Sequence, residues 1–176
     1  MPGGDVHAAR AVFGGDEFRR LYRGTKGEAD WIAGDPEFDF TALFSQFDTI
    51  LVGRRTFEGM VTAGRVSIPG MKTIVFSRTL RREDHPGVAI VMDGQRETLA
   101  ALKAGPGKDI WLFGGGLLFR SLAQDGLVDT VEVRIVPILL GAGVPLLPSL
   151  GNRIKLSLTA HIVYKTGIVS LEYVIT

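Results

Sequence analysis

The chain has 176 residues, 45% of them hydrophobic, which is enough for one domain with a substantial apolar core. Its net charge of +1, with no apolar run near the ~18 residues of a membrane span, gives no reason to expect nucleic acid or a membrane as partner. The absence of cysteine excludes disulfides, thiol nucleophiles and thiolate metal sites, suits a cytoplasmic protein, and leaves no set of metal ligands that we can identify.

The first thirty residues show no sustained period of 2 or 3.6, and glycine pairs interrupt them repeatedly. Residues 14–18 read Gly-Gly-Asp-Glu-Phe, the signature pentapeptide of diguanylate cyclases. That domain needs a strand, a helix pair and a metal-binding aspartate upstream, whereas thirteen residues precede the pentapeptide here. We therefore interpret the match as accidental.

From residue 31 onward, strand and helix patterns alternate. The expected elements are a helix over 40–47, a strand over 49–52, a loop at 54–58 running into a helix, strands over 73–76 and 88–91, a helix over 97–104, a strand over 111–113, a helix over 117–124, a strand over 130–136, and a hairpin of strands over 156–164 and 168–175. Continuous apolar strands between helices predict an α/β fold with a mostly parallel central sheet covered on both faces. The C-terminal antiparallel hairpin would make the sheet mixed.

Three of the expected strands end in residues that suit an anion. Gly53 leads into Arg54 and Thr56, Ser77 precedes Arg78, and a triple-glycine turn occupies 114–116. Ligands of open α/β sheets bind beyond the carboxyl ends of the strands, so these segments should face one crevice. Bare backbone N–H groups, guanidinium groups and hydroxyls are donors that a dinucleotide with a 2′-phosphate needs. Taken singly, each glycine could merely turn the chain and each arginine could be a solvated charge, but three at successive strand ends favour a site.

Two other phosphate motifs fail. Residues 105–109 suggest a P-loop, but Leu102 stands where its first glycine belongs and Asp109 replaces the required Ser or Thr. The turn at 114–116 lacks the full G-x-G-x-x-G spacing because position 119 is Phe. The usual Rossmann fingerprint is therefore absent.

Segments 51–57, 75–78, 113–116, 126–129 and 137–143 resemble, in order and spacing, the C-terminal reductase domain of the bifunctional riboflavin-biosynthesis deaminase-reductase. Stand-alone relatives of that domain are often described as dihydrofolate reductase-like. The resemblance implies a three-layer dihydrofolate reductase-like fold, NADPH as cofactor and a homodimer. It also implies that 53–56 and 77–78 hold the phosphates and adenosine end of NADPH and that the glycine turn holds the pyrophosphate. The expected cofactor-binding residues are Gly53, Arg54, Thr56, Ser77, Arg78, Gly114, Gly115, Gly116, Leu117, Leu118 and Phe119.

The N-terminus departs from this family, whose members begin with a central strand and a Ser-x-Asp-Gly-x-Ile-Ala loop that lines the substrate and nicotinamide pocket. Residues 15–24, written in permitted codons and read from the second base, give Ala-Met-Ser-Phe-Asp-Gly-Tyr-Ile-Ala-Gly, which is that loop. We interpret residues 1–25 as an atypical, frame-shifted segment, and 26–176 as the reductase-like domain. On this interpretation the first strand should be missing, and the cyclase-like pentapeptide is a by-product of the shift.

The sequence therefore predicts an NADPH-dependent reductase that passes hydride to a small pterin- or pyrimidine-type heterocycle or to a carbonyl compound. No catalytic residue is assigned. Asp35, Glu37 and Asp39 lie near the helix where dihydrofolate reductases place their carboxylate, but they precede the helix and are interpreted as solvated loop charges. Dihydrofolate reduction proper is one alternative, and a non-catalytic dinucleotide-binding dimer is another.

Overall fold

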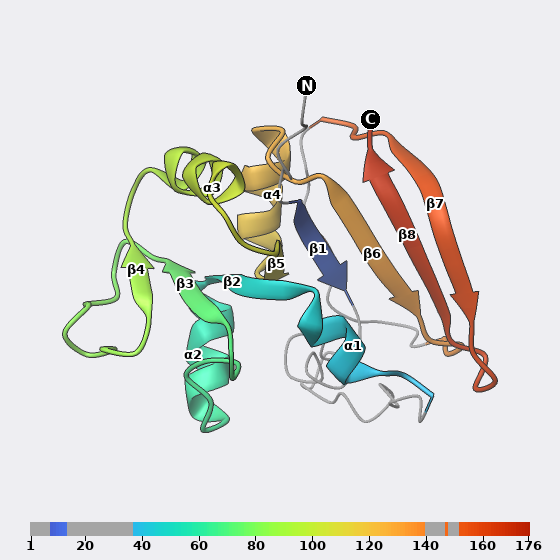
Figure 1. The fold of residues 1–176 in the computed structure, drawn as a ribbon, viewed down its shortest axis with the longest axis horizontal. Helices are drawn as coiled ribbons and strands as arrows, with labels where there is room; N and C mark the ends of the chain where they lie inside the picture. The colour runs from blue at the N-terminus through green and yellow to red at the C-terminus, as the bar shows by residue number, and fades with distance from the viewer. Residues whose placement is uncertain (1–7, 14–36, 140–146, 148–151) are drawn as a thin grey trace.

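The computed structural model describes residues 8–13, 37–139, 147 and 152–176 (Figure 1). Its elements are β1 Ala9–Phe13, α1 Phe40–Ser45, β2 Phe47–Gly53, α2 Arg54–Thr62, β3 Lys72–Phe76, β4 Ala89–Val91, α3 Gln95–Ala104, β5 Asp109–Gly114, α4 Gly116–Gln124, β6 Thr130–Ile135, β7 Leu156–Val163 and β8 Val169–Ile175. One sheet holds the strands in the order β4-β3-β2-β5-β1-β6-β8-β7. Only β8 runs antiparallel to its neighbours β6 and β7. The expected α/β fold with a mostly parallel sheet and a C-terminal hairpin is confirmed.

Two apolar layers lie on opposite faces of the sheet, because alternate residues of each buried strand point to opposite sides. In β5, Leu112 packs with α3 and α4, whereas Trp111 packs with α1 and α2. Strand β2 divides in the same way, with Leu51 in the first cluster and Ile50 in the second. The sheet is therefore the middle of three layers. Among the described residues, no helix combines the length and apolar character needed to cross a membrane.

The expectation that the first strand is missing was wrong. Strand β1 lies in the middle of the sheet, parallel to β5 and β6 on either side (Figure 1). Ala9 and Ala11 are fully buried toward α4, while Arg10, between them, points to the α1 side. A strand of five residues with an arginine at its second position gives almost no periodic signal, which is why the sequence did not reveal it. The pentapeptide at 14–18 and the residues that follow it, up to 36, lie outside the described residues.

Two boundaries near the site also differ from expectation. Phe47 starts β2 instead of ending α1, and its ring stacks on Trp111 at a centroid distance of 5.3 Å. No loop separates β2 from α2, because Gly53 is both the last residue of the strand and the N-cap of the helix. The strand therefore passes directly into a helix at the carboxyl edge of the sheet.

Asp129, just before β6, forms hydrogen bonds to β1, α3 and β8 at the amino edge of the sheet, opposite the predicted site. Its Oδ2 accepts a hydrogen bond from the backbone N–H of Ala9 at 2.7 Å, and Lys103 Nζ of α3 lies 2.6 Å from the same oxygen. Its backbone carbonyl accepts from the N–H of Ile175 at 2.9 Å. The side chain thus links β1 to α3 where β6 begins.

We expect Asp129→Ala to lower the free energy of unfolding by about 1–2 kcal/mol. The variant loses the carboxylate that accepts hydrogen bonds from two donors, the Ala9 N–H and Lys103 Nζ. Urea denaturation followed by circular dichroism measures this. Asp125→Ala is the matched control, since Asp125 is exposed and only its backbone is hydrogen bonded in the described contacts. Equal stability of the two variants would contradict the role of Asp129.

Candidate functional site

Three of the predicted segments lie in a row at the carboxyl edge of the sheet. Gly53 at the end of β2 is opposite Phe76 of β3, and Val52 is opposite Gly114 of β5. Each strand end is followed directly by its polar or glycine-rich segment. The register irregularity between Leu51 and Val52 places one extra residue, Phe113, in β5, so that Gly114 lies opposite Val52 instead of Gly53. The structure therefore brings 53–56, 77–78 and 114–116 to one edge.

The N-caps of two helices touch at this edge. Gly115 caps α4 and Gly53 caps α2, and neither helix has a side-chain cap. A Cβ added to Gly115 would lie 3.6 Å from the Cα and N of Gly53 and 3.6 Å from Thr56 Oγ1. Gly115 also has φ +102°, a conformation that side chains rarely adopt. The first intrahelical bond of α4 runs from Phe119 N to Gly115 O at 2.9 Å, so the N–H groups before Phe119 precede the helical ladder.

The paired N-termini of α2 and α4, which we call the notch, form an electropositive region without any charged side chain. Each helix presents unsatisfied N–H groups and the positive end of its dipole, and here the two ends converge. The arrangement suits an anion with several oxygens, such as a pyrophosphate. Glycine at both caps keeps the backbone open to close approach.

The other predicted side chains differ in how available they are. Arg78 is exposed, and Arg54 forms a surface ion pair with Glu58 at 2.8 Å. Thr56 is buried to 2% exposure beside Gly115. Ser77 Oγ accepts hydrogen bonds from the backbone N–H groups of residues 79 and 80, at 3.2 and 3.1 Å, and so closes the turn after β3. The Ser77 side chain thus shapes the loop that presents Arg78.

The three residues after the glycine turn divide between surface and core. Leu117 is 57% exposed, whereas Leu118 and Phe119 are 6% and 3% exposed and pack under the sheet edge in the α3–α4 cluster. The side chains of Leu118 and Phe119 therefore anchor the glycine turn in the core. Leu118 can contribute to the notch only through its backbone N–H.

A cavity of about 490 Å³ lies beside α1, over the polar face of β6, β8 and β7. Phe38, before α1, and Tyr164, after β7, line it near the carboxyl edge, and Arg10 lines it near the amino edge. The sequence pointed to neither Arg10 nor Arg134 as part of a site.

Arg134 is the principal buried charge of this cavity, with a side chain 6% exposed. Its Nη2 donates to Glu132 Oε1 at 2.9 Å, and its Cζ lies 3.7 Å from the centroid of the Phe38 ring. Ser170 Oγ donates to the same Glu132 oxygen at 3.0 Å. The alternation of Glu132 and Arg134 with Val131 and Val133 was the available signal, because it puts two opposite charges on one face of a strand beside the sheet centre.

The acidic residues near α1 have structural partners. Asp39 is the N-cap of α1, and its Oδ1 accepts from Ala42 N at 2.8 Å. Glu37 pairs with Lys165 of the β7–β8 turn. Both line the cavity, while Asp35 lies outside the described residues. In this structure Asp39 serves as a helix cap.

Comparisons with known proteins agree with this architecture. The family model of the RibD C-terminal domain matches residues 22–170. The uncharacterized protein YyaP of Bacillus subtilis (strain 168) is 35% identical over 162 residues, covering 85% of this chain and 86% of that protein. The fold is similar to that of a putative riboflavin biosynthesis protein from Shewanella sp. PV-4, with TM-score 0.76 and 24% identity over 96% of this chain and 99% of the other. It is also similar to dihydrofolate reductase from Enterococcus faecalis, solved as a complex with NADP(H), with TM-score 0.61 and 18% identity over 96% of both chains.

Proposed function

Because the chain belongs to the RibD C-terminal domain family, we propose that it is an oxidoreductase that binds NADPH at the carboxyl edge of the sheet. The substrate class is a small pterin- or pyrimidine-type heterocycle or a carbonyl compound. The observation that carries the proposal is the contact between the uncapped N-termini of α2 and α4 at Gly53 and Gly115. Glycine at both caps leaves the backbone N–H groups open to a bound pyrophosphate, and the φ of +102° at Gly115 disfavours any side chain there.

The residues present fit this cofactor. The backbone of Gly114, Gly115 and Gly116 would hold the pyrophosphate, together with Thr56 Oγ1. Arg54 and Arg78 would hold the 2′-phosphate end, with Arg54 leaving its ion pair with Glu58. When bound, the reduced nicotinamide supplies the hydride, and the protein supplies placement and exclusion of water.

The cavity beside α1 is the proposed substrate site. Its volume is large enough for one small heterocycle, since ligand pockets span about 300–1,000 Å³. The Arg134 guanidinium stacked on Phe38 offers a planar donor at its wall. We also propose a homodimer and a cytoplasmic location, which the resemblance to the family and the cysteine-free composition favour.

Calorimetric titration with NADPH and with NADH tests the proposal, followed by absorbance at 340 nm in the presence of dihydrofolate and a panel of pterins and pyrimidines. We expect NADPH to bind more tightly than NADH and to be consumed with a member of the panel. Consumption with dihydrofolate alone would favour dihydrofolate reduction proper. NADPH binding with no turnover would favour a non-catalytic dinucleotide-binding protein, and failure of both cofactors to bind would overturn each of these readings.

We expect Gly115→Ala to weaken NADPH binding at least tenfold, because the new Cβ occupies the space between the two helix caps and strains a positive φ. Gly126→Ala is the matched control. Gly126 has φ +68° at the other end of α4, with nothing within 4 Å of its added Cβ. Its variant should lose comparable stability but keep the affinity for NADPH. Equal affinities of the two variants would argue against pyrophosphate at the glycine turn.

A further inference from the structure

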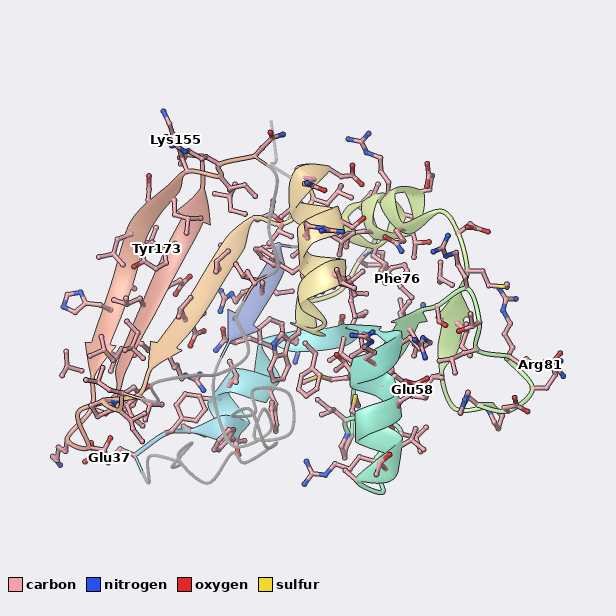
Figure 2. The ribbon with its side chains drawn as sticks, turned by 180° about the vertical axis from the view of Figure 1, so that it is seen from behind. Glu37, Glu58, Phe76, Arg81, Lys155 and Tyr173 are labelled. Atoms are coloured by element: carbon pink, nitrogen blue, oxygen red, sulfur yellow. The ribbon has the colours of Figure 1, made fainter. Side chains whose placement is uncertain are left out.

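Four carboxylates of the described residues line the cavity beside α1: Glu37, Asp39, Glu132 and Glu172. Glu37 lies beside the turn that joins β7 and β8 (Figure 2), where it pairs with Lys165, and Asp39 is occupied as the cap of α1. Glu132 of β6 and Glu172 of β8 lie opposite each other in register, on the polar face of the sheet. These two carboxylates therefore face the same part of the cavity.

Glu132 is held more firmly than Glu172. Its side chain is 13% exposed, and its Oε1 accepts hydrogen bonds from Arg134 Nη2 at 2.9 Å and from Ser170 Oγ at 3.0 Å. Both of these donors are 6% exposed. Glu172 is 33% exposed, and the distance of 3.9 Å between its Oε1 and Arg10 Nη2 is an ion pair without a hydrogen bond. Two buried donors on one oxygen fix the orientation of the Glu132 carboxylate alone.

The second oxygen of Glu132, Oε2, is open to the cavity. It accepts no hydrogen bond from the residues that the structure describes, whose contacts with this side chain all fall on Oε1. It is also not one of their fully buried side-chain atoms without a partner, in contrast to Thr130 Oγ1 on the same strand. Since an ionised carboxylate oxygen only accepts hydrogen bonds, Glu132 offers the cavity one acceptor in a fixed place.

We propose that Glu132 determines the specificity of this cavity by accepting a hydrogen bond from an N–H group of an amino-substituted heterocycle. The proposal rests on the cavity being the substrate site, as proposed above, and narrows the substrate class. An exocyclic amino group beside a ring N–H turns donors toward the carboxylate. A carbonyl oxygen in the same place would set two acceptors against each other, which a site with a fixed polar group rejects. Carbonyl compounds without N–H groups are therefore disfavoured.

The surroundings of Glu132 make this hydrogen bond a strong determinant. Arg134, which fixes Oε1, is itself held, because its Cζ lies 3.7 Å from the ring centroid of Phe38 just before α1. The acceptor is thus supported from both the sheet and the α1 side of the cavity. A hydrogen bond to an ionised group that is largely withdrawn from water is stronger than one between neutral groups in water.

Glu132→Gln tests the proposal, because glutamine keeps the shape of the side chain. Its amide oxygen can still accept from Arg134 and Ser170, which places an NH₂ group where Oε2 was. The probes are pterin (2-amino-4-oxopteridine) and lumazine (2,4-dioxopteridine), which differ in bearing an amino group or a carbonyl oxygen at one position. Binding is measured by titration of the protein into each probe, through the fluorescence of the probe.

The wild-type chain should bind pterin at least tenfold more tightly than lumazine. In Glu132→Gln this affinity ratio should fall at least tenfold, because the new donor faces a donor of pterin but an acceptor of lumazine. Glu172→Gln is the matched control, the same change on the opposite strand, and should keep the ratio within about twofold. Since both probes are measured on the same protein, partial unfolding of a variant leaves the ratio unchanged.

Three results would overturn the role of Glu132: an unchanged ratio in Glu132→Gln, an equal fall in Glu172→Gln, or a wild-type chain that binds neither probe. Calorimetric titration of the wild-type chain with NADPH separates this proposal from the proposed function. NADPH binding together with an unchanged ratio in Glu132→Gln would overturn the role of Glu132 and leave the cofactor proposal in place. Absence of NADPH binding would overturn the cofactor proposal, while the ratio still decides the role of Glu132.

Discussion

Trp111→Ala is expected to lower the free energy of unfolding by about 3–5 kcal/mol, the cost of removing a large aromatic side chain from a packed core. Trp111 is 1% exposed and has ring contacts with Phe44, Phe47 and Phe113 at centroid distances of 5.7, 5.3 and 5.1 Å. These rings join α1 to β2 and β5. Since small domains are stable by about 5–15 kcal/mol, the loss is a large fraction of the total.

Urea unfolding followed by far-UV circular dichroism measures this loss without relying on the tryptophan signal. Trp111→Phe should lower the free energy of unfolding by less than half as much as Trp111→Ala, because phenylalanine keeps an aromatic ring in the cluster. If Trp111→Ala lowers the free energy of unfolding by less than about 1 kcal/mol, Trp111 is not central to the apolar cluster between the sheet and helices α1 and α2.

The second large effect concerns the segment after β1. Phe13 lies opposite Val133 at the end of β1, so the chain leaves the sheet at the carboxyl edge, between the glycine turn and the cavity beside α1. We propose that residues 1–25 are frame-shifted, although residues 9–13 still form the central strand β1, and that the family's substrate loop is missing for this reason. Replacing residues 15–24 by Ala-Met-Ser-Phe-Asp-Gly-Tyr-Ile-Ala-Gly is then expected to raise NADPH-dependent turnover at least tenfold.

The same ten residues in scrambled order are the control, and both chains should bind NADPH equally, because the notch between α2 and α4 is unchanged. Turnover is measured at 340 nm over the pterin and pyrimidine panel. Equal turnover by the chain with the family loop and the chain with the scrambled loop would contradict the frame-shift proposal. Resequencing the locus provides an independent check, since an unshifted frame confirmed by a second method would also contradict it.

The cofactor edge could be anticipated from the sequence because it follows from local signals. Gly53, Ser77 and the turn at 114–116 each end a recognisable strand, and parallel strands bring their carboxyl ends to one edge. The direct contact between the caps at Gly53 and Gly115 could not be predicted, since it depends on β2 lying beside β5 and on a register irregularity in that pair.

The substrate side could not be predicted for a different reason. Arg10, Glu132 and Arg134 are scattered through short strands, and only the placement of β1 beside β6 brings them to one face. Strand β1 itself was missed because Arg10 interrupts its apolar pattern. Turns are signalled by local residues such as glycine, but the pairing of distant strands leaves no recognisable pattern in segments this short.

Hydrogen exchange of the wild-type chain with and without NADPH tests the central claim most directly. If the cofactor binds between the N-termini of α2 and α4, the amides of 54–56 and 116–118 should exchange at least tenfold more slowly in its presence. The amides of Gly105, Gly107 and Lys108 in the alternative glycine segment, on the opposite edge of the sheet, should be unaffected. Protection at 105–108 without protection at 54–56 and 116–118 would contradict the account.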